Sequence, residues 1–222
     1  MLILGIDDAG RGPVIGPMVL AGCLMNEKTE KEFKVLGIKD SKQLTQKRRE
    51  ILAEKIKEKT ETFEIITIPP IEIDKTNQKG INLNALEAIK MAEIINKINK
   101  GFGKIKVIID CPSVSISPWQ DFLKTKIKNL SNLEISCEHK ADKNHISVSA
   151  ASILAKCVRE KEMDILKEKH GKIIGSGYCS DPLTQRFLKE HFDNPKTEGL
   201  FRKTWKTWKD VYSRKEQKTL SF

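Results

Sequence analysis

Short apolar strands alternate with helical segments along most of this chain. Five segments have the length and the apolar, β-branched content of strands: residues 2–7, 18–25, 63–68, 104–110 and 133–138. Helices are predicted from near Thr45, behind a possible N-cap at Asn82, and from near Ser147 to Gly171. Strands that alternate with helices indicate an α/β domain built around one sheet.

The pattern changes after the third helix. The stretch "SDPLTQRFLKEHF" predicts a helix capped by Ser180 or Asp181, with a proline in its first turn. The basic stretch after it carries Trp205 and Trp208, and we expect these two rings to dock the last helix onto the core. The predicted domains are residues 1–170 and a helical C-terminal appendage with a basic tail, residues 171–222.

Charge, hydropathy and cysteine content favour a protein that binds nucleic acid and argue against a membrane, secreted or disulfide-rich protein. The 222 residues include 40 Lys and Arg against 30 Asp and Glu, and a net charge of +10 favours a polyanionic partner such as nucleic acid. The apolar runs are too short to span a bilayer, and the apolar first residues meet two acids at once, unlike a signal peptide. Five widely spaced cysteines argue against a zinc site or a disulfide framework. We therefore expect a cytoplasmic protein with no membrane partner.

Four acids lie at or near the ends of predicted elements: Asp7, Asp8, Asp110 and Asp142. Carboxylates that converge repel one another unless divalent cations neutralise them. Two such ions about 3.5–4 Å apart activate water and stabilise the leaving oxygen in phosphodiester hydrolysis. Spacing alone leaves another interpretation open, because aspartates at strand ends also cap turns or pair with lysines. Neighbours on a strand point to opposite faces, so Asp7 and Asp8 share a site only if the strand ends or twists there.

Six segments together resemble ribonuclease HII, most closely its compact archaeal form. In chain order they are "GIDDAGRGPVIGPMV", "KDSKQLT", "VIIDCPS", "HKADKNHISVSAASILAKCVRE", "GSGYCSDPLT" and "KTWKTWK". They follow the order of the family and cover nearly the whole chain. The resemblance implies an α/β fold, a ribonuclease H-like mixed sheet flanked by helices, with a small helical appendage at the C-terminus.

The resemblance also implies an activity. Such an enzyme is an endonuclease that hydrolyses the bond 5′ of ribonucleotides in RNA/DNA hybrids, and of single ribonucleotides in duplex DNA, leaving a 3′-hydroxyl and a 5′-phosphate. The implied cofactor is Mg²⁺ or Mn²⁺, two ions with substrate bound, and the implied processes are DNA replication and repair. The family's catalytic and metal-binding acids correspond to Asp7, Asp8, Asp110 and Asp142. Asp7 and Asp110 would ligate the metals most directly.

Ribonucleotide recognition has its own positions in the family. These correspond to Gly10, Arg11, Gly12, Tyr178, Lys42 and Arg159. Glycines let backbone groups approach a sugar, and the 2′-hydroxyl is what distinguishes RNA from DNA. In the family the Gly-Arg-Gly turn contacts that hydroxyl and the tyrosine packs on the sugar. Lys42 and Arg159 would hold phosphates or orient the acids, and a solvated surface role stays open for both.

The chain departs from the family pattern at one acid. The family has Asp-Glu where this chain has Asp7-Asp8, and the shorter side chain reaches less far. One alternative is therefore a catalytically weakened relative that binds hybrids but turns over poorly. A second is the same fold with another chemistry, such as polynucleotidyl transfer. The Gly10–Gly12 turn and Tyr178 argue against the second, because ribose recognition serves a ribonuclease.

The last residues raise the question of a protein partner. In "QKTLSF", Gln217, Leu220 and Phe222 resemble a shortened form of the motif by which replication proteins bind the sliding clamp. One aromatic residue is missing and the other comes one residue early. A frayed tail is the competing interpretation. We expect a monomer.

Overall fold

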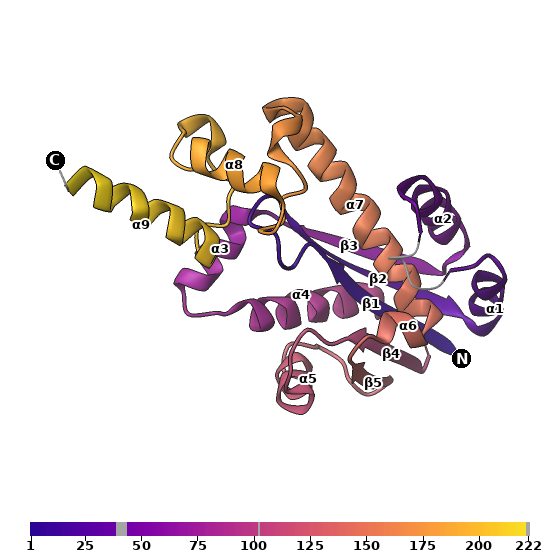
Figure 1. Cartoon of the computed structure of the whole chain (residues 1–222). Coiled ribbons are helices and arrows are strands. Elements are labelled where there is room, and N and C mark those ends of the chain that lie inside the picture. The colour runs from indigo at the N-terminus through magenta and orange to yellow at the C-terminus, as the bar shows by residue number, and fades with distance from the viewer. Residues whose placement is uncertain (39–43, 102, 221–222) are drawn as a thin grey trace. The chain divides into compact units, whose positions relative to one another are not determined.

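A mixed sheet of five strands forms the centre of the fold in the computed structural model (Figure 1). The structure describes residues 1–38, 44–101 and 103–220, and their side chains as far as Arg214. The strands are β1 (Leu2–Ala9), β2 (Met18–Asn26), β3 (Thr62–Ile68), β4 (Ile105–Asp110) and β5 (Leu133–Glu138). Their order across the sheet is β3-β2-β1-β4-β5. This mixed sheet, flanked by helices, confirms the predicted fold class.

The pairing of β1 sets the position of the acids. β1 pairs antiparallel with β2 and parallel with β4. Ile6 lies opposite Ile109, so Asp7 and Asp110, the next residue on each strand, are level with each other. Parallel neighbours end at the same edge of a sheet, which brings these two carboxylates to one edge.

The described helices are α1 (Glu27–Val35), α2 (Gln46–Lys59), α3 (Pro70–Gln78), α4 (Leu83–Ile98), α5 (Ile116–Lys124), α6 (Ala141–Asn144), α7 (Ile146–His170), α8 (Pro182–His191) and α9 (Lys206–Leu220). Two short 3₁₀ helices are η2 (Lys172–Ile174) and η3 (Pro195–Thr197). The predicted caps at Asn82 and Asp181 are confirmed, because their side chains accept hydrogen bonds from the first turns of α4 and α8. Thr45, near which a helix was predicted to begin, caps α2 in the same way. The described residues contain no helix that is both long and apolar enough to cross a membrane.

The chain divides into two compact units. The first comprises Met1–Ala9, Val19–Thr67 and Asn82–Val158, and the second comprises Gly10–Met18, Ile68–Ile81 and Arg159–Phe222. These units interleave along the chain, whereas the predicted domains divide it once, at residue 170. The division into domains 1–170 and 171–222 stays a prediction.

Helices cover both faces of β2 in the first unit. Its alternate residues Val19, Ala21, Cys23 and Met25 pack in one cluster with side chains of α1, α2 and α7. Gly22 points the other way, against Ile94 of α4. The run of β2 is therefore apolar throughout, as is typical of a strand buried on both sides.

The second unit has a separate core rich in aromatic rings. Phe187, Phe192 and Phe201 pack there, and the rings of Trp205 and Trp208 pack against that cluster. Trp208 also stacks on Tyr212, with ring centroids 5.1 Å apart. The expected docking by the two tryptophans is thus observed.

Candidate active site

Asp7 is a buried carboxylate at the end of the central strand. Only 4% of the residue is exposed, and its Oδ1 accepts a hydrogen bond from the backbone N–H of Asp8 at 2.7 Å. Burial raises the pKa of Asp7 well above its usual value, and the negative charges of Asp8 and Asp110 raise it further. A hydrogen bond with the Ser152 side chain of α7 opposes this rise in pKa. The site therefore concentrates negative charge in a place with little water.

A close contact between β1 and α7 sets where Asp7 lies. Gly5 and Asp7 point to the same face because side chains alternate along a strand. A Cβ on Gly5 would overlap the backbone of Ser147 and Val148, so only glycine admits the helix at this distance. The same approach brings Ser152, one and a half turns further along α7, to the Asp7 carboxylate.

Asp110 and Asp142 are linked through the first turn of α6. The Oδ1 atom of Asp110 accepts a hydrogen bond from the backbone N–H of Ala141 at 3.0 Å, and Asp142 is the next residue. Asp142 is 4% exposed, and its backbone carbonyl accepts a hydrogen bond from the hydroxyl of Ser149 in α7. The negative charges of Asp8 and Asp110 thus act on Asp7, and Asp110 is hydrogen-bonded to Ala141, the residue before Asp142.

These carboxylates do not form a ready-made metal cage. Within the described ranges, no three His, Cys, Asp or Glu side chains are arranged to hold an ion by themselves. Mg²⁺ rarely needs such a cage, because it keeps several waters and binds through one or two carboxylates plus substrate phosphates. The buried Asp7 carboxylate, with the negative charges of Asp8 and Asp110 acting on it, supplies hard oxygen donors that fit a divalent cation of that kind. β1 also runs on to Ala9, so Asp8 lies within the strand and is half-buried.

A second group of predicted residues comes together within the second unit. Gly10 has a φ of +79°, which favours glycine, and a Cβ there would overlap the side chain of Arg159. The guanidinium of Arg159 lies 5.0 Å from the ring centroid of Tyr178 and donates a hydrogen bond to the Ser176 carbonyl at 3.1 Å. Tyr178 itself is 43% exposed. The exposed ring, the buried arginine and the glycine turn therefore form one cluster.

Arg159 also keeps a donor unused. The residue is 8% exposed, and among the described residues its Nε–H has no hydrogen-bond partner. Burial lowers the pKa of Arg159. An unsatisfied buried donor costs free energy unless a ligand supplies the acceptor. A phosphate or sugar oxygen would meet that need.

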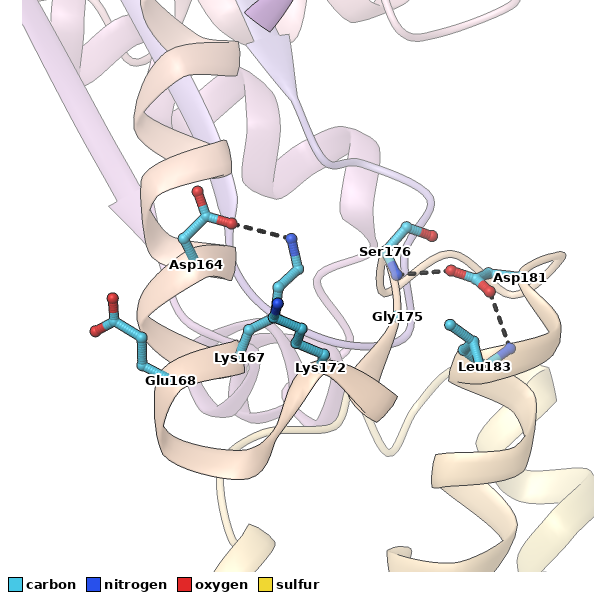
Figure 2. Close-up of a pocket in the computed structure, with 8 residues that line it drawn as sticks. All are labelled: Asp164, Lys167, Glu168, Lys172, Gly175, Ser176, Asp181 and Leu183. Carbon is cyan, nitrogen blue, oxygen red and sulfur yellow. Dashed lines mark hydrogen bonds and ion pairs between the residues drawn. The ribbon is translucent and has the colours of Figure 1, made fainter.

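The segment that carries Tyr178 borders a pocket of about 620 Å³ (Figure 2). Asp181 anchors this segment, since its carboxylate accepts hydrogen bonds from the backbone N–H groups of Ser176 at 2.6 Å and Leu183 at 2.9 Å. On the α7 side of the pocket, Asp164 pairs with Lys167 at 3.0 Å. Asp164 and Asp181 are therefore both paired within the protein, and the hydrogen bonds of Asp181 hold the loop before α8 in place.

A model of the family described as ribonuclease HII matches residues 4–208. The chain belongs to the ribonuclease HII family. Ribonuclease HII of Methanococcus maripaludis strain C7 is 42% identical over 217 residues, 97% of this chain and 89% of the relative. The crystal structure of ribonuclease H2 from Pyrococcus horikoshii OT3 matches with a TM-score of 0.86 at 35% identity, covering 98% of this chain and 100% of that one. The ribonuclease HII solved as a PCNA complex from Archaeoglobus fulgidus matches with a TM-score of 0.81 at 37% identity, covering 94% and 96%.

Membership of the ribonuclease HII family settles the class of the enzyme. The chain is a metal-dependent endoribonuclease of the ribonuclease H type, and it acts on RNA in RNA/DNA hybrids.

Four of the predicted contact residues are not fully described by the structure: Lys42 and Phe222, and the side chains of Gln217 and Leu220, lie outside the described residues. Sequence reasoning missed Arg202, a buried residue of the second unit that donates to the carbonyls of the Gly10–Gly12 turn. Its neighbours in "FRKTWK" gave no signal of a buried cation, because the lysines of this stretch were expected to face a nucleic-acid duplex.

Proposed function

We propose that this ribonuclease HII family member cleaves 5′ of ribonucleotides in RNA/DNA hybrids and of single ribonucleotides in duplex DNA, leaving a 3′-hydroxyl and a 5′-phosphate. The observation that supports it most is the buried Asp7 carboxylate, whose pKa is raised by burial and by the charges of Asp8 and Asp110. Carboxylates grouped in this way repel one another and destabilise the metal-free protein. Such a cost is expected at an active site where the carboxylates bind divalent cations.

Four acids would hold the cation or cations: Asp7, Asp8, Asp110 and Asp142. When bound, Mg²⁺ or Mn²⁺ supplies an activated water and stabilises the leaving oxygen, two ions being expected with substrate. Asp7 presents its carboxylate in a fixed direction, since the N–H of Asp8 and the Ser152 side chain hold it. Asp110 is held in the same way by the N–H of Ala141.

The second unit would supply recognition of the ribose. We propose that the backbone of Gly10, Arg11 and Gly12 contacts the 2′-hydroxyl, and that the exposed ring of Tyr178 packs on the sugar. Arg159 would hold a phosphate with its unused Nε–H. Lys42 would add a further phosphate contact. Cations that neutralise phosphates make binding weaken with salt.

The experiment that tests the proposal uses a labelled DNA duplex with one ribonucleotide. The chain is compared with Asp110→Asn and Asp8→Glu, with Mg²⁺ or Mn²⁺ added. A cut 5′ of the ribonucleotide that Asp110→Asn abolishes supports the metal-dependent mechanism. Cleavage seen only after Asp8→Glu would instead support the alternative of a hybrid-binding relative weakened by Asp8. No cleavage by either would refute the substrate assignment.

The cellular role and the partners are part of the same proposal. We propose a cytoplasmic monomer that acts in DNA replication and repair. The related ribonuclease HII from Archaeoglobus fulgidus was solved in complex with PCNA. This supports a sliding clamp as partner here, with Gln217, Leu220 and Phe222 as its contacts. A clamp that binds the full chain but not a Leu220→Ala variant would support the contact; equal binding of both would refute it.

A further inference from the structure

A buried arginine holds the carbonyl oxygens of the Gly10–Gly12 turn. Arg202 is 0% exposed, and its Nη2 donates to the Gly10 carbonyl at 2.6 Å while its Nη1 donates to the Arg11 carbonyl at 2.8 Å. Its Nε and Nη2 also donate to the Gly16 carbonyl, at 3.1 and 3.0 Å. One guanidinium therefore joins both ends of the segment 10–16.

Trp205 completes this contact. Its Nε1–H donates to the Gly12 carbonyl at 3.1 Å, and its ring lies 4.9 Å below the guanidinium of Arg202. All three carbonyls of the Gly-Arg-Gly turn thus accept hydrogen bonds from one short segment of the chain, 202–205.

Fixing the carbonyl groups of the Gly10–Gly12 turn also fixes the directions of its N–H groups. In a planar trans peptide the C=O and the following N–H point in opposite directions. Because the Gly10 and Arg11 carbonyls point at Arg202, the N–H groups of Arg11 and Gly12 are directed away from it. The turn therefore has its hydrogen-bond donors fixed on the side opposite Arg202.

An anchor on α3 holds the 202–205 segment in turn. The buried carboxylate of Asp74 accepts hydrogen bonds from the N–H of Lys203 at 2.7 Å, the N–H of Thr204 at 3.0 Å and the hydroxyl of Thr204 at 2.6 Å. Burial and, to a smaller extent, the charge of Arg159 lower the pKa of Arg202 to about 10, so the guanidinium stays charged at neutral pH. The hydrogen bonds of the Arg202 guanidinium go to backbone carbonyls and fix their directions, which points to an orienting role.

We propose that Arg202 is a positioning residue for ribonucleotide recognition: with Trp205 it fixes the Gly10–Arg11–Gly12 backbone so that its N–H groups meet the 2′-hydroxyl and the adjoining phosphate. This inference rests on the proposed function of that turn. Arginine is needed because its planar fork reaches three carbonyls at once, whereas lysine is a point charge on a flexible stem.

The test compares three variants that all alter the second unit. Arg202→Lys keeps the charge but loses the fork, and Trp205→Phe keeps a ring but loses the hydrogen bond to Gly12. Phe192→Leu is the matched control, since it thins the same core and does not touch the turn. For each variant we would measure unfolding, kcat and KM on a single-ribonucleotide duplex, and Kd in EDTA for that duplex and for an all-DNA duplex.

The expected result is a loss of selectivity without a loss of general affinity. In Trp205→Phe the preference for the ribonucleotide duplex should fall about fivefold, the equivalent of one hydrogen bond. In Arg202→Lys, kcat/KM should fall about 10- to 100-fold, because small displacements of positioning groups have effects of this size. Kd for all-DNA duplex should stay unchanged in both, and Phe192→Leu should lose stability alone.

Other outcomes would overturn the inference. If Arg202→Lys and Trp205→Phe fold and keep the preference and kcat/KM of the unmodified chain, Arg202 has no positioning role. If Phe192→Leu loses as much selectivity as they do, the effect reports only a loosened core. If Arg202→Lys does not fold, the selectivity of Trp205→Phe alone still tests the inference. An unmodified chain that neither prefers nor cuts the ribonucleotide duplex would refute the proposed function, and this inference with it.

Discussion

Replacing Gly5 with alanine should separate the strand that carries Asp7 from the helix that packs on it. The added methyl group would overlap main-chain atoms of Ser147 and Val148, which cannot rotate out of the way as a side chain can. Overpacking costs about 1–3 kcal/mol, and a clash with the main chain belongs at the upper end. For a chain of this length, about 3 kcal/mol lowers Tm by about 6–12 °C.

The change should act on catalysis as well as on stability. Moving α7 outward withdraws Ser152 from the Asp7 carboxylate, so kcat/KM should fall about 10- to 100-fold even at temperatures far below Tm. The assays are thermal unfolding and cleavage of a labelled hybrid with Mg²⁺.

Gly22→Ala is the matched control for this prediction. Its methyl group would overlap the Cγ2 atom of Ile94, a stiff β-branched side chain of α4, so a loss of about 1–3 kcal/mol is expected. Cleavage should be retained, because α4 carries none of the four acids. A Gly5→Ala protein as stable and active as the parent would refute the reasoning. Equal losses of activity in both variants would show that the effect comes from general destabilisation.

Three further predictions concern titratable groups. Asp7→Asn should abolish cleavage yet stabilise the metal-free protein by about 1 kcal/mol, because it removes a buried charge that Asp8 and Asp110 repel. Because the native pKa of Asp7 is raised, the stability advantage of Asp7→Asn in urea unfolding should grow as pH rises from the usual aspartate pKa to that raised value and then level off. An advantage that is largest in acid would contradict this. Asp181→Ala should cost about 1 kcal/mol by removing the α8 cap. Hydrogen bonds from Ser176 lower the pKa of Asp181, so its contribution is full at neutral pH and is lost as pH falls through that lowered value; a pH-independent difference in unfolding free energy would count against this. Burial raises the pKa of the Cys137 thiol to about 12 and that of Cys23 further, so both should alkylate far more slowly in the native protein than in urea; equal rates by mass spectrometry would refute their burial.

The sheet and the long helices were predictable because their signals are local. β2 is a continuous apolar run, and Thr45, Asn82 and Asp181 are polar residues placed just ahead of helical periodicity. Each of these signals acts over a few neighbouring residues, so a single sequence reveals it.

Helices α1, α3 and α5 were not predicted, each for a local reason. Asn26 both ends β2 and caps α1, so no turn separates the two elements. The proline pair at 69–70 predicted only the end of β3, although Pro70 is also the first residue of α3. In α5 the buried residues Trp119 and Leu123 recur at helical spacing, a signal that sequence reasoning could have used.

The candidate site also contains residues that the sequence revealed and residues that it did not. The acids were found because they stand at strand ends and match a family pattern. Arg202 was not, because its partners are backbone carbonyls, which every residue type provides and which therefore leave no mark in the sequence. Asp74 was missed likewise, since two of the three groups it binds are backbone N–H groups.

The continuity of β1 with the Gly10–Gly12 turn limits how such an enzyme can be altered. Asp8 and Gly10 are two residues apart, so their Cα atoms are at most about 7 Å from each other. The rise between nucleotides along one strand of a duplex is about 3.4 Å. A single residue inserted or deleted between these two positions would shift the chain by about one nucleotide step. Length variation should therefore be absent here even where the surrounding sequence drifts, and attempts to move the cut relative to the recognised sugar should begin at this junction.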